Sequence, residues 1–360
     1  MVFKIIGFYS LDESSEPQDN SSMLRCIKSF TQEQLINSQF NLNDYDTSDA
    51  STFVDQNQMF FGFLRYLKDK RVLKTNKNPR FVTTEMTLSL FTESMHVLKM
   101  SAVLSDGFIF VSAYTEYESD SARRMQFLKR MQFLKLMQSK VPGFESQQLG
   151  DSDARNRFVC VSESRIDTHT VLFCRTVDGI RTREKTEKRK STGNVAVKKI
   201  LNTGHNDLVN LHTIPATSES SHAIRKQKAM ICSQAILLGG LNKIVFGNYD
   251  ESGNIKSLNE VDLTTLAVDD IAENMGNLTI DSASSPESRK NLLMKTLTEV
   301  ETALMEEAAR VSLKYNLPLK TIPTVQMNFK RIGENLISTG SAYKGYLEIF
   351  YGQCIQDITK

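Results

Sequence analysis

Residues 97–117, VLKMSAVLSDGFIFVSAYTEY, decide the fold class. β-branched and aromatic residues, which favour strands, lie on both sides of the turn sequence Ser105-Asp106-Gly107. A two-residue type I′ turn needs a positive φ at both central residues, and Asp-Gly meets that requirement well. The segment therefore predicts an antiparallel β-hairpin.

Two further chain reversals follow the same logic. Asp178-Gly179 comes after the strand-like residues 169–177, and we expect it to turn the chain back at Ile180. Asp250–Asn254 separates another two strand-like segments. Because successive hairpins build antiparallel sheets, we predict an α+β fold with a mainly antiparallel, hairpin-built sheet, and not a doubly wound parallel fold.

The clearest helix is predicted at residues 285–316, with a capping serine ahead of Pro286. Two strands, at 321–329 and 343–351, should follow it. An apolar stripe with steps of three and four residues runs along about 45 Å of helix. Either the helix crosses a whole domain, or part of it lies in an interface between copies of the chain. The residues assigned to that interface are Leu293, Leu297, Val300, Leu304 and Val311.

The length of 360 residues predicts two folding units or one large one, and 40% hydrophobic residues exclude wholesale disorder. A small, polar segment at 215–221 is typical of a linker. We therefore predict an N-terminal α+β domain at 1–215, which includes a basic centre, and a C-terminal α+β domain at 222–360 that contains the long helix.

The cysteines indicate the compartment. Their number is odd and no CxxC spacing occurs, which favours free thiols in a reducing environment; they are Cys26, Cys160, Cys174, Cys232 and Cys354. The apolar run Val2–Tyr9 is expected to be a buried strand and not a secretory signal. No run reaches the roughly 18 apolar residues of a membrane helix. We expect a cytoplasmic protein without membrane insertion.

A hexapeptide is duplicated within one predicted helix: MQFLKR at 125–130 is followed by MQFLKL at 131–136. Six residues advance a helix by about 600°, so the second copy is rotated by about 120° and apolar side chains point in several directions. A helix that is apolar on several sides is usually buried among neighbours. We predict that the duplication is a packing element.

The net charge of +2 hides a strong asymmetry, since residues 1–120 carry −5, residues 121–230 carry +11 and residues 231–360 carry −4. Excess cations neutralise nucleic-acid phosphates and release counterions, with no need for base-specific residues. We predict that the basic centre contacts a phosphate backbone, provided that its three basic runs fold onto one face. The assigned residues are Arg123, Arg124, Lys129, Arg130, Arg181, Arg183, Lys185, Lys188, Arg189, Lys190, Lys198, Lys199, Arg225, Lys226 and Lys228.

Motifs for familiar chemistry are missing. The chain has no GxSxG, no phosphate-binding glycine loop and no GxGxxG, so no cofactor is predicted. His205, Asp207 and His212 are candidate ligands for a divalent ion, but their spacing matches no known site and favours a structural role. Metal-dependent nucleases often combine an Asp with a downstream (D/E)xK on a strand. Asp151 and Asp153 offer the first part, but no (D/E)xK occurs in the chain.

Three functional hypotheses follow, in order of preference. The first is a protein that binds DNA or RNA non-specifically through its basic centre. The missing catalytic motifs favour a binding protein over an enzyme. The second is a non-catalytic assembly subunit that self-associates, or binds a protein partner, through the helix 285–316. The third is a nuclease or another enzyme of unrecognised type.

Overall fold

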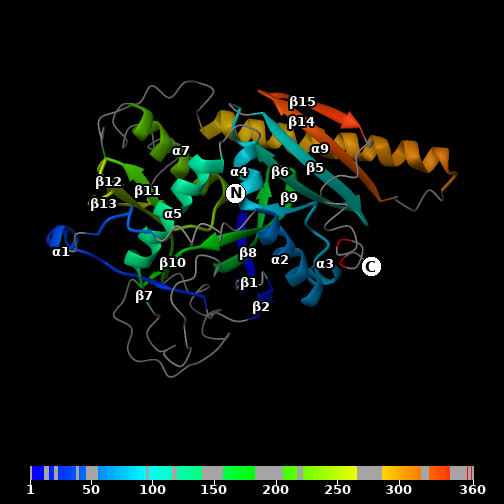
Figure 1. The fold of residues 1–360 in the computed structure, drawn as a ribbon. Helices are drawn as coiled ribbons and strands as arrows, with labels where there is room; N and C mark the ends of the chain where they lie inside the picture. Colours follow the sequence, from blue (N-terminus) through cyan, green and yellow to red (C-terminus); the bar gives the residue numbers. More distant parts are fainter. Residues whose placement is uncertain are drawn as a thin grey trace.

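The computed structural model describes residues 2–11, 16–19, 23–37, 40–45, 56–94, 97–115, 120–139, 157–182, 206–216, 222–265, 286–317, 324–340, 355 and 358. In this part the strands form two sheets, with helices against their faces (Figure 1). No described helix combines the length and the apolar character needed to cross a membrane. The described cysteines, Cys26, Cys160, Cys174 and Cys232, form no disulfides.

The larger sheet has nine described strands. β4 is parallel to its neighbours β6 and β9, and the other pairings in this sheet are antiparallel. In spatial order the strands are β15 (Asn335–Gly340), β14 (Val325–Ile332), β5 (Leu98–Ser105), β6 (Phe108–Thr115), β4 (Phe81–Thr84), β9 (His169–Val177), β8 (Arg157–Ile166), β1 (Val2–Leu11) and β2 (Pro17–Gln18).

The smaller sheet has six described strands. β11 pairs in parallel with β12, and β10 pairs in parallel with β3, whereas the remaining pairs are antiparallel. The order is β13 (Ile255–Asp262), β12 (Lys243–Tyr249), β11 (Asn206–Pro215), β10 (Gly179–Thr182), β3 (Cys26–Ile27) and β7 (Gln138–Ser139). The predicted α+β class with a mainly antiparallel arrangement is confirmed.

Helices cover both faces of each sheet. α4 and α9 pack on the face of the larger sheet that carries Leu104, and α2 packs on the opposite face, which carries Val103. On the smaller sheet, α5 packs against Leu211 and α7 packs against Phe246. The described helices are α1 (Gln32–Asn37), α2 (Gln56–Asp69), α3 (Val72–Thr75), α4 (Glu85–Phe91), α5 (Asp120–Met137), α7 (His222–Leu238) and α9 (Pro286–Lys314).

The hairpin that decides the fold class forms as predicted between β5 and β6. Asp106 has φ 48° and Gly107 has φ 83°, which are the positive values that a type I′ turn requires. The reversal at Asp250–Asn254 also forms, and it joins β12 to β13.

The predicted turn at Asp178-Gly179 is wrong. β8 and β9 form a hairpin around Asp167 and Thr168 instead, and after Asp178 the chain continues from β9 into β10 of the smaller sheet. Gly179 is needed there for close packing, because a Cβ would lie 2.6 Å from Cδ1 of Ile27 and 2.8 Å from the carbonyl oxygen of Arg25. Asp178 is therefore the residue at which the chain changes sheets.

The long helix and the two strands after it are confirmed as α9, β14 and β15. The second strand is β15, and the residues 343–351 predicted for it lie outside the described part of the chain. α9 buries its apolar stripe inside the chain, where Leu293, Leu297, Val300 and Leu304 are fully buried and Val311 is partly buried against the same core. These side chains belong to the core of the chain itself. They are therefore not exposed for the predicted interface between copies of the chain.

The division into units 1–215 and 222–360 remains a prediction about folding units. The sheets do not follow it, because β14 pairs with β5 and β12 pairs with β11. The duplicated hexapeptide does pack as predicted: Met131, Phe133, Leu134 and Leu136 of α5 are buried beneath the smaller sheet.

Candidate nucleic-acid site at the junction of the two sheets

Asp178 joins the two sheets, and its side chain is only 5% exposed. Nη2 of Arg130 donates to both carboxylate oxygens at 2.8 Å, and the backbone N–H of Leu211 donates to Oδ2 at 2.7 Å. Nε2 of Gln138 donates to the backbone carbonyl of Asp178 at 2.6 Å. A buried carboxylate is costly unless it is paired and hydrogen-bonded, and these contacts provide both.

The cation at this site comes from the duplicated hexapeptide of α5. The two copies differ at their last position, which is Arg130 in the first copy and Leu136 in the second. Leu136 is buried in the apolar core beneath the smaller sheet, whereas Arg130 extends to Asp178 and its Nε donates to the carbonyl of Leu211 at 3.4 Å. The one position that distinguishes the two copies therefore supplies the charged group.

Two neutral side chains flank the Leu211 amide on β11. The N–H of Asp178 donates to Oδ1 of Asn210 at 3.3 Å, and the ring of His212 lies 5.9 Å from that of Phe246. Burial and the Arg130 charge lower the pKa of His212 to about 4, against a smaller opposing effect of Asp178. The imidazole is consequently neutral at physiological pH, like the Asn210 amide.

Two of the predicted basic runs have described members on α5, which carries Arg130, and on β10, which follows Asp178. On α5, Nζ of Lys129 lies 4.4 Å from the centre of the Tyr249 ring; the side chains of Arg123 and Arg124, on the same helix, lie outside the description. On β10, Arg181 forms an ion pair with Glu260. Arg181 is therefore already partnered within the chain.

The third basic run lies on the other side of the smaller sheet. Nζ of Lys228 on α7 is 5.6 Å from the Phe246 ring, and Arg225 and Lys226 belong to the same helix. Since α5 and α7 pack on opposite faces of β11 and β12, the described basic runs do not share one face. Successive side chains of β11 and β12 point to opposite faces of the sheet, and α5 and α7 contact different faces.

The remaining predicted cations lie outside the described residues, between β10 and β11. Thr182 and Asn206 are partners in the ladder, so this connection leaves and rejoins the sheet at neighbouring positions. It starts about 13 Å along β10 from Asp178. Its predicted cations are Arg183, Lys185, Lys188, Arg189, Lys190, Lys198 and Lys199.

The three predicted metal ligands are not brought together among the described residues. His212 is the neutral imidazole beside the junction, the Asp207 backbone lies at the start of β11, and His205 lies outside the described residues. Among the residues whose placement is described, no group of three or more His, Cys, Asp or Glu side chains could hold a metal ion.

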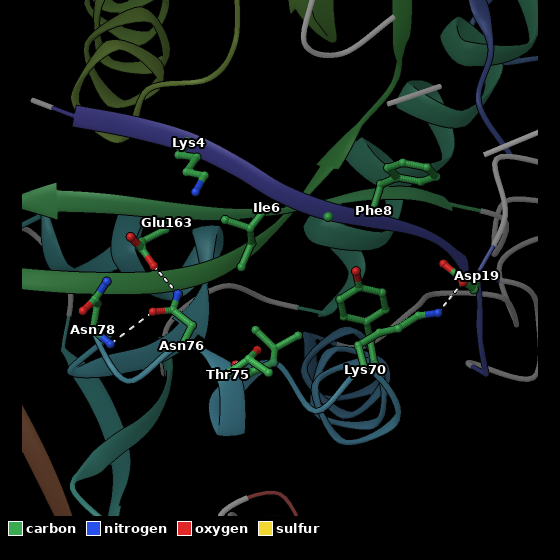
Figure 2. A pocket seen from close by; sticks show the side chains of 12 residues that line it. Lys4, Ile6, Phe8, Asp19, Lys70, Thr75, Asn76, Asn78 and Glu163 are labelled. Carbon is green, nitrogen blue, oxygen red and sulfur yellow. Dashed lines mark hydrogen bonds and ion pairs between the residues drawn. The ribbon is translucent and has the colours of Figure 1, made fainter. Parts of the chain in front are cut away.

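A pocket of about 470 Å³ lies elsewhere, between β1, β8 and the helices α2 and α3 (Figure 2). Lys4 and Glu163 are partners on neighbouring strands, and Nδ2 of Asn76 donates to Glu163 at 2.5 Å. Lys70 forms an ion pair with Asp19 at the other end of the pocket. Glu163-Ser164-Arg165 is an acid-x-cation sequence on a described strand, but Arg165 is exposed and donates to the carbonyl of Asp167 at 3.1 Å.

Two mixed sheets with helices on both faces define an α+β protein, in which Asp178 follows β9 and the polar pair Asn210 and His212 lies on β11. The chain matches the family described as RAI1 like PD-(D/E)XK nuclease over residues 4–339, and it belongs to that family. No curated protein is detectably similar to it in sequence.

Solved structures agree with the fold. Rai1 of Candida albicans, in complex with pU5-Mn²⁺, has a TM-score of 0.64 and 14% identity, and the match covers 99% of this chain and 94% of that one. Rai1 of Scheffersomyces stipitis, in complex with (3′-NADP)⁺ and calcium, has a TM-score of 0.63 at 11% identity, with 99% and 94% covered. Dxo1 of K. lactis, in complex with manganese, has a TM-score of 0.56 at 10% identity, with 95% and 90% covered.

The sequence interpretation missed Asp178 and Asn210 and treated the nuclease hypothesis as the least favoured of three. Asp178 carried a usable signal, because it ends a strongly apolar strand, but Asp-Gly suggested a turn instead. The search for (D/E)xK gave the correct negative result and pointed away from the right family.

Proposed function

We propose that this protein binds RNA close to the junction around Asp178, on the side of the smaller sheet covered by α5. The observation that supports the proposal most directly is the family membership over residues 4–339. A member of the same fold, Rai1 of Candida albicans, is complexed with the ribonucleotide oligomer pU5. The excess positive charge of residues 121–230 supplies the attraction for phosphate groups.

The geometry favours two of the three basic runs for this role. Arg123 and Arg124 lie near the start of α5, seven and six residues before Arg130, which is about 10 Å along the helix. The basic connection between β10 and β11 starts within about 13 Å of Asp178 along a straight strand. α7 covers the opposite sheet face, so we assign a smaller part of the binding to Lys226 and Lys228.

Fluorescence anisotropy with 5′-phosphorylated oligouridylate tests this proposal. We expect micromolar affinity at about 50 mM salt and a loss of at least about tenfold at about 200 mM salt. Lys129→Glu should weaken binding several-fold, whereas Lys4→Glu, the same change at the distant pocket, should have little effect. Absence of binding at low salt, or equal effects of the two variants, would contradict the proposal.

Hydrolysis of RNA is a second candidate function, and the family match is the observation that favours it. A 5′-phosphorylated, 3′-labelled RNA would then be shortened in the presence of Mn²⁺. Gel analysis of a time course with wild-type protein distinguishes the two candidates, since binding alone leaves the RNA intact.

A further inference from the structure

The family is described by the motif PD-(D/E)XK, in which an acid is followed at the second position by lysine. In this sequence no Asp or Glu anywhere in the 360 residues has lysine two positions later. The motif that gives the family its name is therefore missing as a sequence.

The structure indicates which residues lie at the corresponding place. In nucleases of this kind an Asp is paired with a (D/E)xK on a neighbouring strand, and Asp178 contacts β11 through the Leu211 amide. The residues on either side of Leu211 are Asn210 and His212. An amide and an imidazole thus have the spacing of the acid and the lysine, and two residues apart on a strand they share one face, the face of β11 on which His212 lies beside Phe246.

The solved structures named above contain manganese or calcium. The question is whether Asp178, Asn210 and His212 could hold such an ion here. Both ions prefer several oxygen ligands, and carboxylates are the usual charged ones. Here the Asp178 carboxylate already accepts two contacts from Arg130 and one from Leu211. Asn210 carries no charge, and no cluster of three ligating side chains is present among the described residues. The residues described at the junction do not fit a divalent cation.

Arg130 supplies the positive charge that a metal would otherwise supply. A guanidinium and a carboxylate at 2.8 Å form a charge-assisted pair, and together they are neutral. A divalent cation would have to displace this pair or approach a fixed positive charge, and both are unfavourable in a partly buried site.

We propose that Arg130 takes the place of a divalent cation at Asp178, so that this family member binds RNA without metal and does not cleave it through Asp178. The part about RNA rests on the proposed function; the part about the metal does not. The ligand class is single-stranded RNA with a phosphorylated end, held by cations of the chain.

Manganese binding to the purified full chain tests the metal part directly. We expect electron paramagnetic resonance titrations to show no manganese site that depends on Asp178. Asp178→Asn is the test variant, and Asp167→Asn, at the exposed turn before the same strand, is the matched control. A site present in wild type and in Asp167→Asn but lost in folded Asp178→Asn would overturn the proposal.

Wild-type protein alone provides a second measurement, which does not depend on the folding of any variant. Affinity for 5′-phosphorylated oligouridylate in EDTA and in dilute MnCl₂ at the same ionic strength should agree within about twofold, since the phosphate contacts are made by side-chain cations. The RNA should stay intact in both. Binding that needs Mn²⁺, or Mn²⁺-dependent cleavage that Asp178→Asn abolishes, would overturn the proposal. Failure to bind RNA under any condition would contradict the proposed function instead, and the manganese titration would still judge the metal part.

Discussion

The junction around Asp178 and the pocket around Glu163 both hold a carboxylate beside a cation, but they differ in what surrounds the acid. Asp178 is 5% exposed, and its oxygens contact a guanidinium and a backbone amide. Glu163 lies at an open pocket, where Asn76 donates to it and Lys4 is its partner on the adjacent strand (Figure 2). An acidic residue can therefore be a buried, hydrogen-bonded part of the fold, or it can line a pocket that small molecules can enter. Sequence spacing alone does not distinguish the two.

The largest effect is expected when Asp178 is removed. Asp178→Ala leaves the Arg130 guanidinium and the Leu211 amide without their partner, and we expect a loss of about 3 kcal/mol in the free energy of unfolding. Urea denaturation measures this loss. Asp69→Ala, at the exposed end of α2, should cost less than about 0.5 kcal/mol. Similar losses for the two variants would show that Asp178 is no more structural than a surface acid.

The next effect is a pH dependence of the free energy of unfolding, which we expect from His212 at the junction and not from the pocket. The folded-state pKa of His212 is lowered from 6.5 to about 4, so the unfolded chain takes up the proton first. Stability from this group is fully present above about pH 6.5 and declines as the pH falls towards 4, by at most about 1.4 kcal/mol per pH unit. Urea denaturation at several pH values should show a shallower decline for His212→Gln than for wild type. Equal slopes would mean that His212 is accessible to protons in the folded state.

A smaller effect is expected at the pocket. Glu163→Gln keeps an oxygen for the Asn76 amide but removes the charge, and we expect a loss of about 1 kcal/mol or less. Thermal unfolding measures the change, and RNA affinity should be unaltered. A loss as large as that of Asp178→Ala would remove the contrast between the two regions.

Much of the fold could be predicted because it depends on local signals. Asp106-Gly107 fixes a type I′ turn by its backbone preferences, and the apolar stripe of 285–316 specifies a buried helix. Asp178-Gly179 has the same dipeptide, but there tertiary packing decides: Gly179 lies against Ile27 and Arg25, more than 150 positions earlier in the chain. A dipeptide cannot report such a contact.

The candidate site was harder to predict than the fold. His212 was recognised as a candidate ligand and Arg130 as a cation. Both lie near Asp178 only because the chain crosses from the larger sheet to the smaller one at that residue. The charge asymmetry located the basic centre, yet it could not show that α5 and α7 lie on opposite faces of the smaller sheet. Alternation along β11 and β12 becomes informative only once the strands are paired.

The smallest expected effect concerns Lys129, the residue before Arg130 on α5. Its ammonium lies 4.4 Å from the Tyr249 ring centre, and Lys129→Ala removes one cation without opening the Asp178 contacts. If Lys129 neutralises one phosphate, the slope of log affinity against log salt should fall by about one, with a stability change below about 1 kcal/mol. Anisotropy titrations at several salt concentrations measure the slope, and Lys4→Ala at the pocket is the control because it removes the same charge from β1 of the larger sheet. An unchanged slope for Lys129→Ala would place the RNA away from this end of α5, whereas a reduced slope for Lys4→Ala would place it across the pocket as well.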